Sequence, residues 1–484
     1  MARAHRSVPK VAAAASAFFA LACGTGHEPR VIRNVVLVSI DTLGALHSSA
    51  YGYDRRTTPN LDRVAQAGTL FERAYTQQVW TLTSHVTMMT GLYPQTHGAS
   101  QMRPAHPGAT TLAEILKEAG FDTAAFAGPG AYMKPYFGLG RGFDRYENWQ
   151  VAYRDDNAAA LQWIAEQARA QATDPARRFF LFIHYFAAHS DGETLVPYDS
   201  PPRYRQQFLP DGFKWDRRGD SRLLVELQKE GNVTAEDQRI LTALYDAGVL
   251  FTDETSFGPL LSGLSSFGFD EDTLVIVTAD HGEEIFEHGS ALHQQPYEET
   301  ARVPLVLRGP GIPVGLRIPD LVELVDLMPT ILGLLSLPVP AHVQGRDLAP
   351  LLRGKTREPA EVYVDGLMGA LPHARARLPS NLTLDGEGGS WSYVARVTDR
   401  PGEAGGFAID GAAELYRLDA DPRQQQDVAA QHPELVRRME RKLLDFYTRN
   451  AKLGAALAAD HEVGTVPLLS EEEIVQLKRL GYGH

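Results

Sequence analysis

The sequence predicts an α/β protein with a large, mostly parallel β-sheet flanked by helices. Three nearly all-apolar runs indicate this fold: residues 34–41 (NVVLVSID), 179–186 (FFLFIHYF) and 273–280 (TLVIVTAD). Such runs are typical of strands buried on both faces of a parallel sheet. Amphipathic segments lie between them, so strands and helices alternate over roughly 300 residues, as they do in α/β domains.

The amphipathic segments carry the start and stop signals of helices. Thr58 stands at a capping position before Pro59, and Gly68 follows the last turn of the helix that this pattern predicts. Thr111 and Glu114 have the spacing of a capping box, which opens the segment TLAEILKEAG. We therefore expect both segments to be helices that pack on the sheet.

The composition changes after about residue 355. Short alternating strands (EVYVD, SYVARVT and GAAELYRLD) are separated by glycine-rich turns, and a helix over 433–447 follows with Leu435, Met439 and Leu443 on one stripe. This pattern predicts a small antiparallel sheet with a helix packed against it. The expected organisation is a main domain over 34–355, a small α+β subdomain over 356–450 and a charged tail over 451–484.

Residues 1–23 have the features of an export signal: a basic start, the apolar run VAAAASAFFALA, and then Cys23. The small residues before Cys23 resemble a bacterial lipobox, although Ala20 stands where leucine is usual. We therefore expect an exported protein of a bacterium, either periplasmic or anchored to the membrane as a lipoprotein through Cys23. The alternative is cleavage of a plain signal peptide, with Cys23 discarded.

Charge and cysteine content exclude several classes of protein. Lys and Arg number 47 against 60 Asp and Glu, so the net charge is -13. That sign does not suit a nucleic-acid partner, which would be held by phosphate contacts. A single cysteine excludes a disulfide framework and a cysteine-based zinc site. The 16 histidines indicate instead a metal bound by imidazole and carboxylate groups.

Two of the predicted buried strands end in acids: Asp41 follows the first, and Asp280 with His281 follows the last. In open α/β sheets the ligand site lies outside the carboxyl ends of the strands. A buried carboxylate there is costly unless a partner such as a metal ion compensates its charge. Each Asp alone could instead cap the helix that follows it. Two such acids, one of them joined to His281, favour metal coordination.

The segment VWTLTSHVTMMTG, residues 79–91, places hydroxyl groups at the start of a short apolar helix. Thr81, Thr83 and Ser84 precede or open that helix, which is predicted to start at about Ser84 and to end at Gly91. A helix N-terminus attracts anions such as phosphate or sulfate. A metal next to one of these hydroxyls would make it a nucleophile. Ordinary N-capping explains the segment equally well when it is taken alone.

A series of blocks follows between about residues 34 and 447: NVVLVSIDTLGALHSSAYGY, TTPNLDRVAQAGTLFERAY, TSHVTMMTGLYPQTHG, FFLFIHYFAAH, TADHGEEIFEHG, HQQPYEETARVPLVLRGPG, VDLMPTILGLL and ELYRLDADPRQQQDVAAQHPELV. In this order the blocks resemble the sulfatase family of the alkaline phosphatase superfamily. The resemblance implies an alkaline phosphatase-like fold over 34–355, with the catalytic site in that domain.

The sequence departs from the family at the nucleophile. Sulfatases usually carry a C/S-x-P-x-R motif whose first residue matures to formylglycine, whereas the aligned residues here are T-L-T-S-H. Thr81 stands at the nucleophile position, with Thr83 and His85 in place of Pro and Arg. A threonine cannot form formylglycine by that route. It is similar to the nucleophile of the superfamily's phosphodiesterases and phosphoethanolamine transferases.

The resemblance implies one divalent metal ion held by Asp41, Asp280 and His281, with Thr81 touching the same ion. Thr42 stands where many sulfatases carry a second Asp. The imidazole of His281 favours zinc or manganese, with calcium as the remaining candidate.

Three further histidines are implied as catalytic residues: His85, His189 and His293. His293 precedes Tyr297 by four residues and matches a position that the family uses for a cationic group near the ester. His189 matches the histidine that closes the family's HYFDPH pattern. His184, inside the predicted strand, is expected to be structural.

The leading hypothesis is a metal-dependent hydrolase of sulfate or phosphate esters that works through a covalent intermediate on Thr81. Its substrate would be a small-molecule, glycan or lipid-headgroup anionic ester. The alternatives are a phosphodiesterase or phosphonate ester hydrolase, a phosphoethanolamine-type transferase, and an inactive ester-binding protein.

Overall fold

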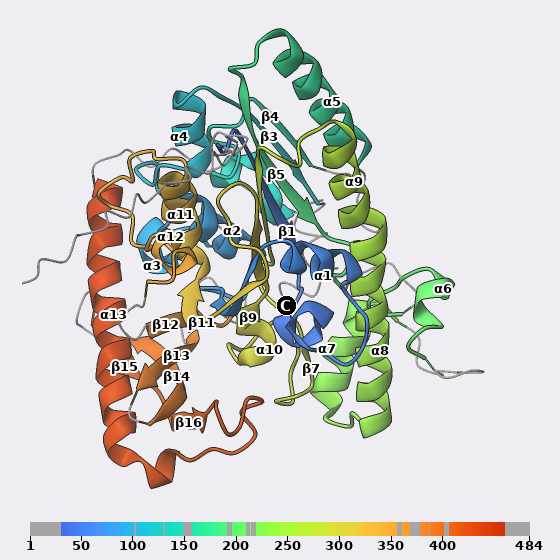
Figure 1. Ribbon diagram of the computed structural model, residues 1–484. Coiled ribbons are helices and arrows are strands. Elements are labelled where there is room, and N and C mark those ends of the chain that lie inside the picture. Colours follow the sequence, from blue (N-terminus) through green and yellow to red (C-terminus); the bar gives the residue numbers. More distant parts are fainter. Residues whose placement is uncertain are drawn as a thin grey trace, which may run out of the picture.

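The chain folds around two main β-sheets, a large one and a smaller one (Figure 1). The structure, a computed structural model, describes residues 31–100, 103–128, 131–148, 157–190, 196–209, 213, 219–355, 361–367, 378–386, 388–400 and 406–459. The predicted signal segment 1–23 and residues 460–484 of the predicted tail lie outside this part of the chain. No helix in these ranges is long and apolar enough to cross a membrane.

The large sheet has its strands in the order β11-β2-β10-β6-β1-β5-β3-β4, and β9 pairs with β2. The strand bounds are β1 Asn34–Ile40, β2 Thr69–Tyr75, β3 Phe121–Ala127, β4 Arg145–Asn148, β5 Arg178–Tyr185, β6 Thr273–Thr278, β9 Arg302–Val303, β10 Leu305–Arg308 and β11 Leu316–Glu323. Pairing is parallel among β6, β1, β5, β3 and β4, and between β11 and β2, whereas β10 is antiparallel to β6 and to β2. The predicted fold class, a mostly parallel sheet, is confirmed.

The three apolar runs form the centre of this sheet, with β1 between β5 and β6. Every residue of β1 and of β6 is buried, as expected for strands covered on both faces. Helices α5, α8 and α9 lie on one side of the sheet in Figure 1, and α2, α4 and α11 lie on the other. Their bounds are α2 Thr81–Thr90, α4 Leu112–Glu118, α5 Ala158–Thr173, α8 Ala235–Thr252, α9 Gly258–Ser266 and α11 Leu327–Leu334. The shorter helices are α1 Pro59–Gln66, α3 Pro94–His97, α6 Pro202–Arg205, α7 Ser221–Glu230, α10 Glu298–Ala301 and α12 Ala349–Leu352.

The predicted helix starts are present. Thr111 and Glu114 form the reciprocal capping box of α4, with Glu114 N donating to Thr111 Oγ1 at 3.1 Å and Thr111 N donating to Glu114 Oε2 at 2.7 Å. Thr58 is the N-cap of α1 and Pro59 its first residue, but the Thr58 hydroxyl donates to Asp62 Oδ1 instead of capping the backbone. The position of the N-cap was therefore predicted correctly, but the Thr58 side chain does not make a capping hydrogen bond.

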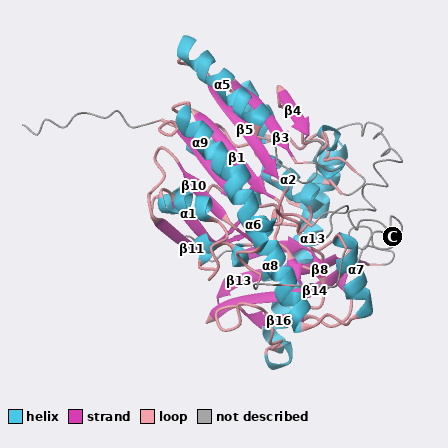
Figure 2. Ribbon diagram, turned by 90° about the vertical axis from the view of Figure 1, so that its right-hand side faces the viewer, coloured by secondary structure: helices cyan, strands magenta, loops and turns pink. Residues whose placement is uncertain are grey.

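The smaller sheet is antiparallel and packs on one long helix, α13 Pro433–Ala459 (Figure 2). Its strands are β12 Glu361–Asp365, β13 Leu378–Gly386, β14 Gly389–Asp399, β15 Phe407–Ile409 and β16 Glu414–Arg417. Leu435, Met439 and Leu443 of α13 lie in the core between helix and sheet, as their spacing predicted. The helix runs twelve residues beyond the predicted end at 447, because its buried face continues through Asn450 and Gly454.

His97 links the two parts of the fold, since α3 packs against both α2 and α13. Its ring is buried, and Ala99 N donates to Nδ1 at 3.1 Å, so the remaining proton sits on Nε2, which lies 3.1 Å from Thr87 Oγ1. Burial, followed by repulsion from His106, lowers the pKa of His97 to about 3.

We expect His97 to make the fold less stable as the pH falls from about 6.5 towards 3, because the unfolded chain then binds a proton that the folded chain does not. At about pH 5.5 this amounts to roughly 1.4 kcal/mol relative to about pH 7.5. Urea unfolding at the two pH values measures the difference. His97→Gln should lose less stability on acidification than the wild type, and an equal loss in both proteins would contradict the assignment.

Candidate active site

Three elements bring the predicted metal ligands to one edge of the large sheet. Asp41 directly follows β1, Asp280 and His281 follow β6, and Thr81 opens α2. Since β1 and β6 are parallel neighbours, the residues beyond their carboxyl ends meet. His281 Nε2 lies 3.3 Å from Asp280 Oδ2, 3.8 Å from Asp41 Oδ1 and 3.4 Å from Thr81 Oγ1. These four predicted residues form one cluster.

The orientation of His281 suits a metal ligand. Its Nδ1–H donates to the carbonyl oxygen of Gly282 at 2.9 Å, so Nε2 presents a lone pair to the carboxylates. Asp41, Asp280 and His281 are all fully buried, so bulk water does not relieve the repulsion among these groups. A cation among them does, and donor atoms around one ion at about 2.0–2.2 Å have spacings of this size. The donor set therefore fits a divalent ion.

Asp280 is held as a carboxylate. Its Oδ1 accepts hydrogen bonds from the backbone N–H of Thr42 at 3.2 Å and of His281 at 2.9 Å. Burial alone would raise its pKa, but the neighbouring imidazoles of His281, His85 and His184 outweigh burial and lower the pKa of Asp280 to about 2. The second oxygen, Oδ2, faces His281 Nε2.

Thr81 is the first residue of α2, so the predicted helix start at about Ser84 was three residues late. Trp80 is extended and acts as the N-cap, and Ser84 N already donates to Trp80 O at 2.9 Å. The apolar pattern did not reveal this extra turn because threonine and serine occupy it. Thr81 therefore lies at the helix N-terminus itself, where backbone N–H groups point at an anion.

The neighbouring hydroxyls are already engaged in structural hydrogen bonds. Thr83 Oγ1 donates to Trp80 O at 3.0 Å, and Ser84 Oγ donates to Asp280 O at 2.7 Å. Thr81 Oγ1 instead faces His281 Nε2. Of the three hydroxyls in this turn, the one on Thr81 is directed at the candidate metal ligands.

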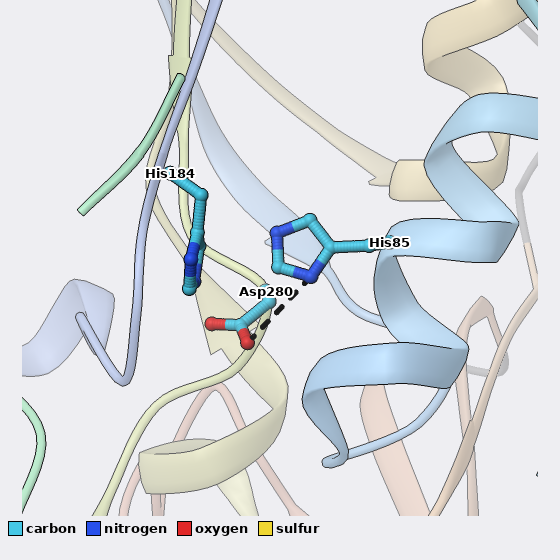
Figure 3. A group of neighbouring side chains, drawn as sticks. All are labelled: His85, His184 and Asp280. Atoms are coloured by element: carbon cyan, nitrogen blue, oxygen red, sulfur yellow. Dashed lines mark ion pairs between the residues drawn. The ribbon is translucent and has the colours of Figure 1, made fainter. Parts of the chain in front are cut away.

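His85 lies beneath this turn with both ring nitrogens engaged. Nδ1 donates to Thr81 O at 2.7 Å, and Nε2 accepts from Ser39 Oγ at 2.9 Å. Burial, followed by repulsion from His184, lowers the pKa of His85 to about 3. Figure 3 shows His85, His184 and Asp280 turned toward one another, a grouping that could also suggest a metal site. Because its nitrogens are used, the ring of His85 is suited to hold Thr81 rather than to bind an ion.

His293 and His189 lie beside the metal ligands, with their rings edge-on to each other. The ring of His293 lies 4.2 Å from that of His281 and 5.4 Å from that of His189. Burial lowers the pKa of His293 to about 4 and places that of His189 well below its usual value. His189 Nδ1 lies 2.5 Å from Ser190 O, which fixes its proton on that nitrogen. Both rings are therefore neutral at pH 7 and can take up a proton.

Sequence reasoning did not single out two residues behind His293. Its Nδ1 shares a hydrogen bond of 3.0 Å with Glu283 Oε2, and Tyr198 Oη donates to Glu283 Oε1 at 2.6 Å. Burial raises the pKa of Glu283 to about 8. In the sequence, Glu283 could have been identified by its place in the DHGEE segment, two residues after His281. Tyr198 had no sequence signal, since it reaches Glu283 across 85 residues.

Thr42 occupies the position of the second family carboxylate without taking over its function. Its φ angle of 58° is unusual for a β-branched residue. The hydroxyl donates to its neighbour Asp41 O at 2.7 Å, and Tyr245 Oη donates to Thr42 O at 2.5 Å. The side chain is thereby turned to the backbone, and the backbone N–H of Thr42 serves Asp280.

A buried cluster of acids, imidazoles and a hydroxyl at the carboxyl edge of a parallel sheet is the arrangement of an active site in an α/β enzyme. Within that class, the sulfatase family model matches residues 33–337, so this chain belongs to the sulfatase family. The predicted family is confirmed, and the predicted enzyme class, a hydrolase of sulfuric or phosphoric esters, is confirmed as a sulfuric ester hydrolase.

Several similar proteins agree with this assignment. Arylsulfatase K of Rattus norvegicus is 24% identical over 447 residues, which cover 85% of this chain and 77% of the rat protein. The phosphonate monoester hydrolase of Agrobacterium radiobacter superposes with a TM-score of 0.63 at 21% identity, covering 86% of this chain and 96% of that protein. A structure solved with its substrate D-glucosamine-2-N,6-O-disulfate gives 0.63 at 19% identity, covering 89% and 99%. At these identities the structures establish the shared fold.

The predicted localisation is wrong. The sequence suggested an exported bacterial protein, periplasmic or anchored as a lipoprotein, but the curated relatives include arylsulfatase K from rat, human and zebrafish, which are eukaryotic proteins. Eukaryotic cells have no periplasm. A few small residues before one cysteine form a short pattern, and an alanine-rich segment produces it through composition alone.

Proposed function

We propose that this chain is a metal-dependent esterase that uses Thr81 as its nucleophile on a sulfate ester or on a related phosphorus ester. One observation carries the proposal: Thr81 Oγ1 lies at the N-terminus of α2 and 3.4 Å from His281 Nε2, within the buried cluster of Asp41 and Asp280. A helix N-terminus and a cation site both favour an anionic ester at this oxygen.

Asp41, Asp280 and His281 would hold one divalent ion, with Thr81 as a fourth ligand. An imidazole in the donor set favours zinc or manganese, with calcium as the remaining candidate. When bound, the ion lowers the pKa of the Thr81 hydroxyl and offsets negative charge on the transferred group. Two further groups of the protein assist. The N–H groups at the start of α2 bind ester oxygens, and His85 holds the Thr81 carbonyl in place.

The reaction needs a group that accepts and returns a proton. Attack by Thr81 Oγ1 on sulfur or phosphorus forms a covalent ester and breaks the bond to the leaving oxygen. His293 or His189, both neutral at pH 7, takes up the proton that Thr81 releases and delivers it to that oxygen. The same imidazole then takes a proton from water, which hydrolyses the ester on Thr81 and restores the hydroxyl.

Phosphonate monoesters and phosphodiesters are the second candidate substrates. Thr81 cannot mature to formylglycine, and two structural neighbours are phosphonate monoester hydrolases. Sulfated glycans are supported by the neighbour solved with a disulfated glucosamine. Transfer to an acceptor other than water, as in phosphoethanolamine transferases, is ranked below hydrolysis.

A panel of four esters decides among these substrates. We expect purified, metal-loaded protein to hydrolyse an aryl sulfate, with an aryl phosphonate monoester and an aryl phosphodiester as the rival substrates and a dianionic aryl phosphate as the poorest. Release of the aryl alcohol measures kcat/KM for each ester. Failure on all four, with metal bound, would leave the inactive ester-binding protein as the better explanation.

The metal assignment predicts that Asp280→Asn and His281→Ala lose bound metal and activity together, because each removes a donor from the buried cluster. Metal content after gel filtration measures the first effect, and turnover measures the second. Asp253→Asn is the matched control, since Asp253 is a buried carboxylate that binds Asn60 and Leu61 on α1 instead. Full metal content in both site variants would contradict the assignment.

The nucleophile assignment predicts that Thr81→Ala loses at least about 1,000-fold in kcat, as expected when a covalent nucleophile is removed. Thr83→Ala is the control from the same turn and should lose far less, because its hydroxyl bonds to Trp80 O. Mass spectrometry of the Thr81 peptide should show an unmodified threonine at rest and a sulfate- or phosphate-sized adduct after quenching. Wild-type turnover in Thr81→Ala would instead favour attack by water.

A further inference from the structure

His184 lies behind the metal cluster, on the strand next to the one that delivers Asp41. In the parallel pairing of β1 with β5, His184 lies opposite Ser39, two residues before Asp41. Alternate residues of a strand point to the same face, so Ser39 and Asp41 share a face of β1. His184 Nε2 approaches Asp41 Oδ2 to 3.2 Å, and both side chains are fully buried.

We infer that His184 is the positioning residue of Asp41: the close ion-pair contact of its Nε2 with Asp41 Oδ2 turns Oδ1 toward the metal. The inference rests on the proposed metal site. Asp41 Oδ1 is the oxygen that faces His281 Nε2, at 3.8 Å, while Oδ2 faces His184. A carboxylate with one oxygen held in this way presents the other in a single direction, which lowers the entropy cost of binding an ion.

The surroundings of His184 fix its ring in this orientation. The ring of His85, whose own nitrogens are bound to Thr81 O and Ser39 Oγ, lies against it edge-on, with the two ring centres 4.8 Å apart. Gly128 also borders the ring, because a Cβ atom there would come within 3.2 Å of His184 Nδ1 and 2.6 Å of Phe186 Cβ. The absence of a side chain at Gly128 thus leaves room for the imidazole of His184.

Orientation of Asp41 matters more here than in a site with three carboxylates. Thr42 contributes no side-chain donor, since its hydroxyl bonds to Asp41 O, so Asp41 and Asp280 supply the negative charge of the cluster. Asp280 is oriented by two backbone N–H groups. His184 gives Asp41 a comparable partner from a side chain. Partners of this kind change metal affinity by about 10–100-fold in other proteins.

The experiment measures the dissociation constant of zinc for the full chain by competition with a chromophoric chelator, and the visible absorption of the cobalt-substituted protein. His184→Ala should bind zinc about 10–100-fold more weakly than the wild type. His184→Gln, whose side-chain amide can donate from nearly the position of Nε2, should recover most of that loss. The cobalt absorption bands of His184→Gln should keep their positions, because the atoms that bind the metal are unchanged.

His97→Gln is the matched control, because His97 is equally buried but bonds to Thr87 and to Ala99 away from the cluster. Zinc affinity of His184→Ala and His184→Gln equal to that of His97→Gln would overturn the inference and leave the proposed function standing. Shifted cobalt bands in His184→Gln would overturn it in favour of His184 as a direct ligand. Absence of zinc, manganese and calcium binding in the wild type would refute the proposed function itself.

Discussion

The burial of two carboxylates at the end of the central strands governs the rest of this structure. Asp41 and Asp280 are fully shielded from water, and each would carry a large desolvation cost if it remained uncompensated. The chain surrounds them with imidazoles from three directions: His281 from the same loop, His85 from α2 and His184 from β5. The strands β6, β1 and β5 are neighbours in the sheet. This order brings Asp280, Asp41 and His184 together.

Backbone groups, as well as side chains, orient the buried carboxylate of Asp280. The unusual φ angle of Thr42 aims its N–H at Asp280 Oδ1, and the carbonyl of the same residue is held by Tyr245. Left-handed conformations of β-branched residues cost of order 1–3 kcal/mol and persist only where the surroundings enforce them. Here the hydrogen bond from Tyr245 on α8 to the carbonyl oxygen of Thr42 holds this conformation. The strain is therefore tied to the orientation of a candidate metal ligand.

Much of the fold and part of the site could be read from the sequence because they depend on local patterns. Runs of apolar residues marked β1, β5 and β6, and the acids that follow β1 and β6 marked the edge at which they meet. Contacts between segments far apart in the chain could not be read in this way. Tyr198 reaches Glu283, and His184 reaches Asp41, only through the packing of the sheet. The start of α2 was missed because its first turn is mostly polar, with Leu82 as its single apolar residue.

A threonine nucleophile places a stricter demand on the histidines than formylglycine would. A formylglycine hydrate can expel its sulfate by elimination, whereas an ester on Thr81 must be cleaved by water at sulfur or phosphorus. The group that receives the proton of Thr81 must therefore act again, as a base toward that water. A buried imidazole that is neutral at pH 7 can do both, and the pKa of His293, lowered to about 4 by burial, meets this condition. Glu283 Oε2 lies 3.0 Å from His293 Nδ1 and so orients this ring beside the metal ligands. In the proposed mechanism, the contact with Glu283 would orient a buried imidazole that both proton transfers use.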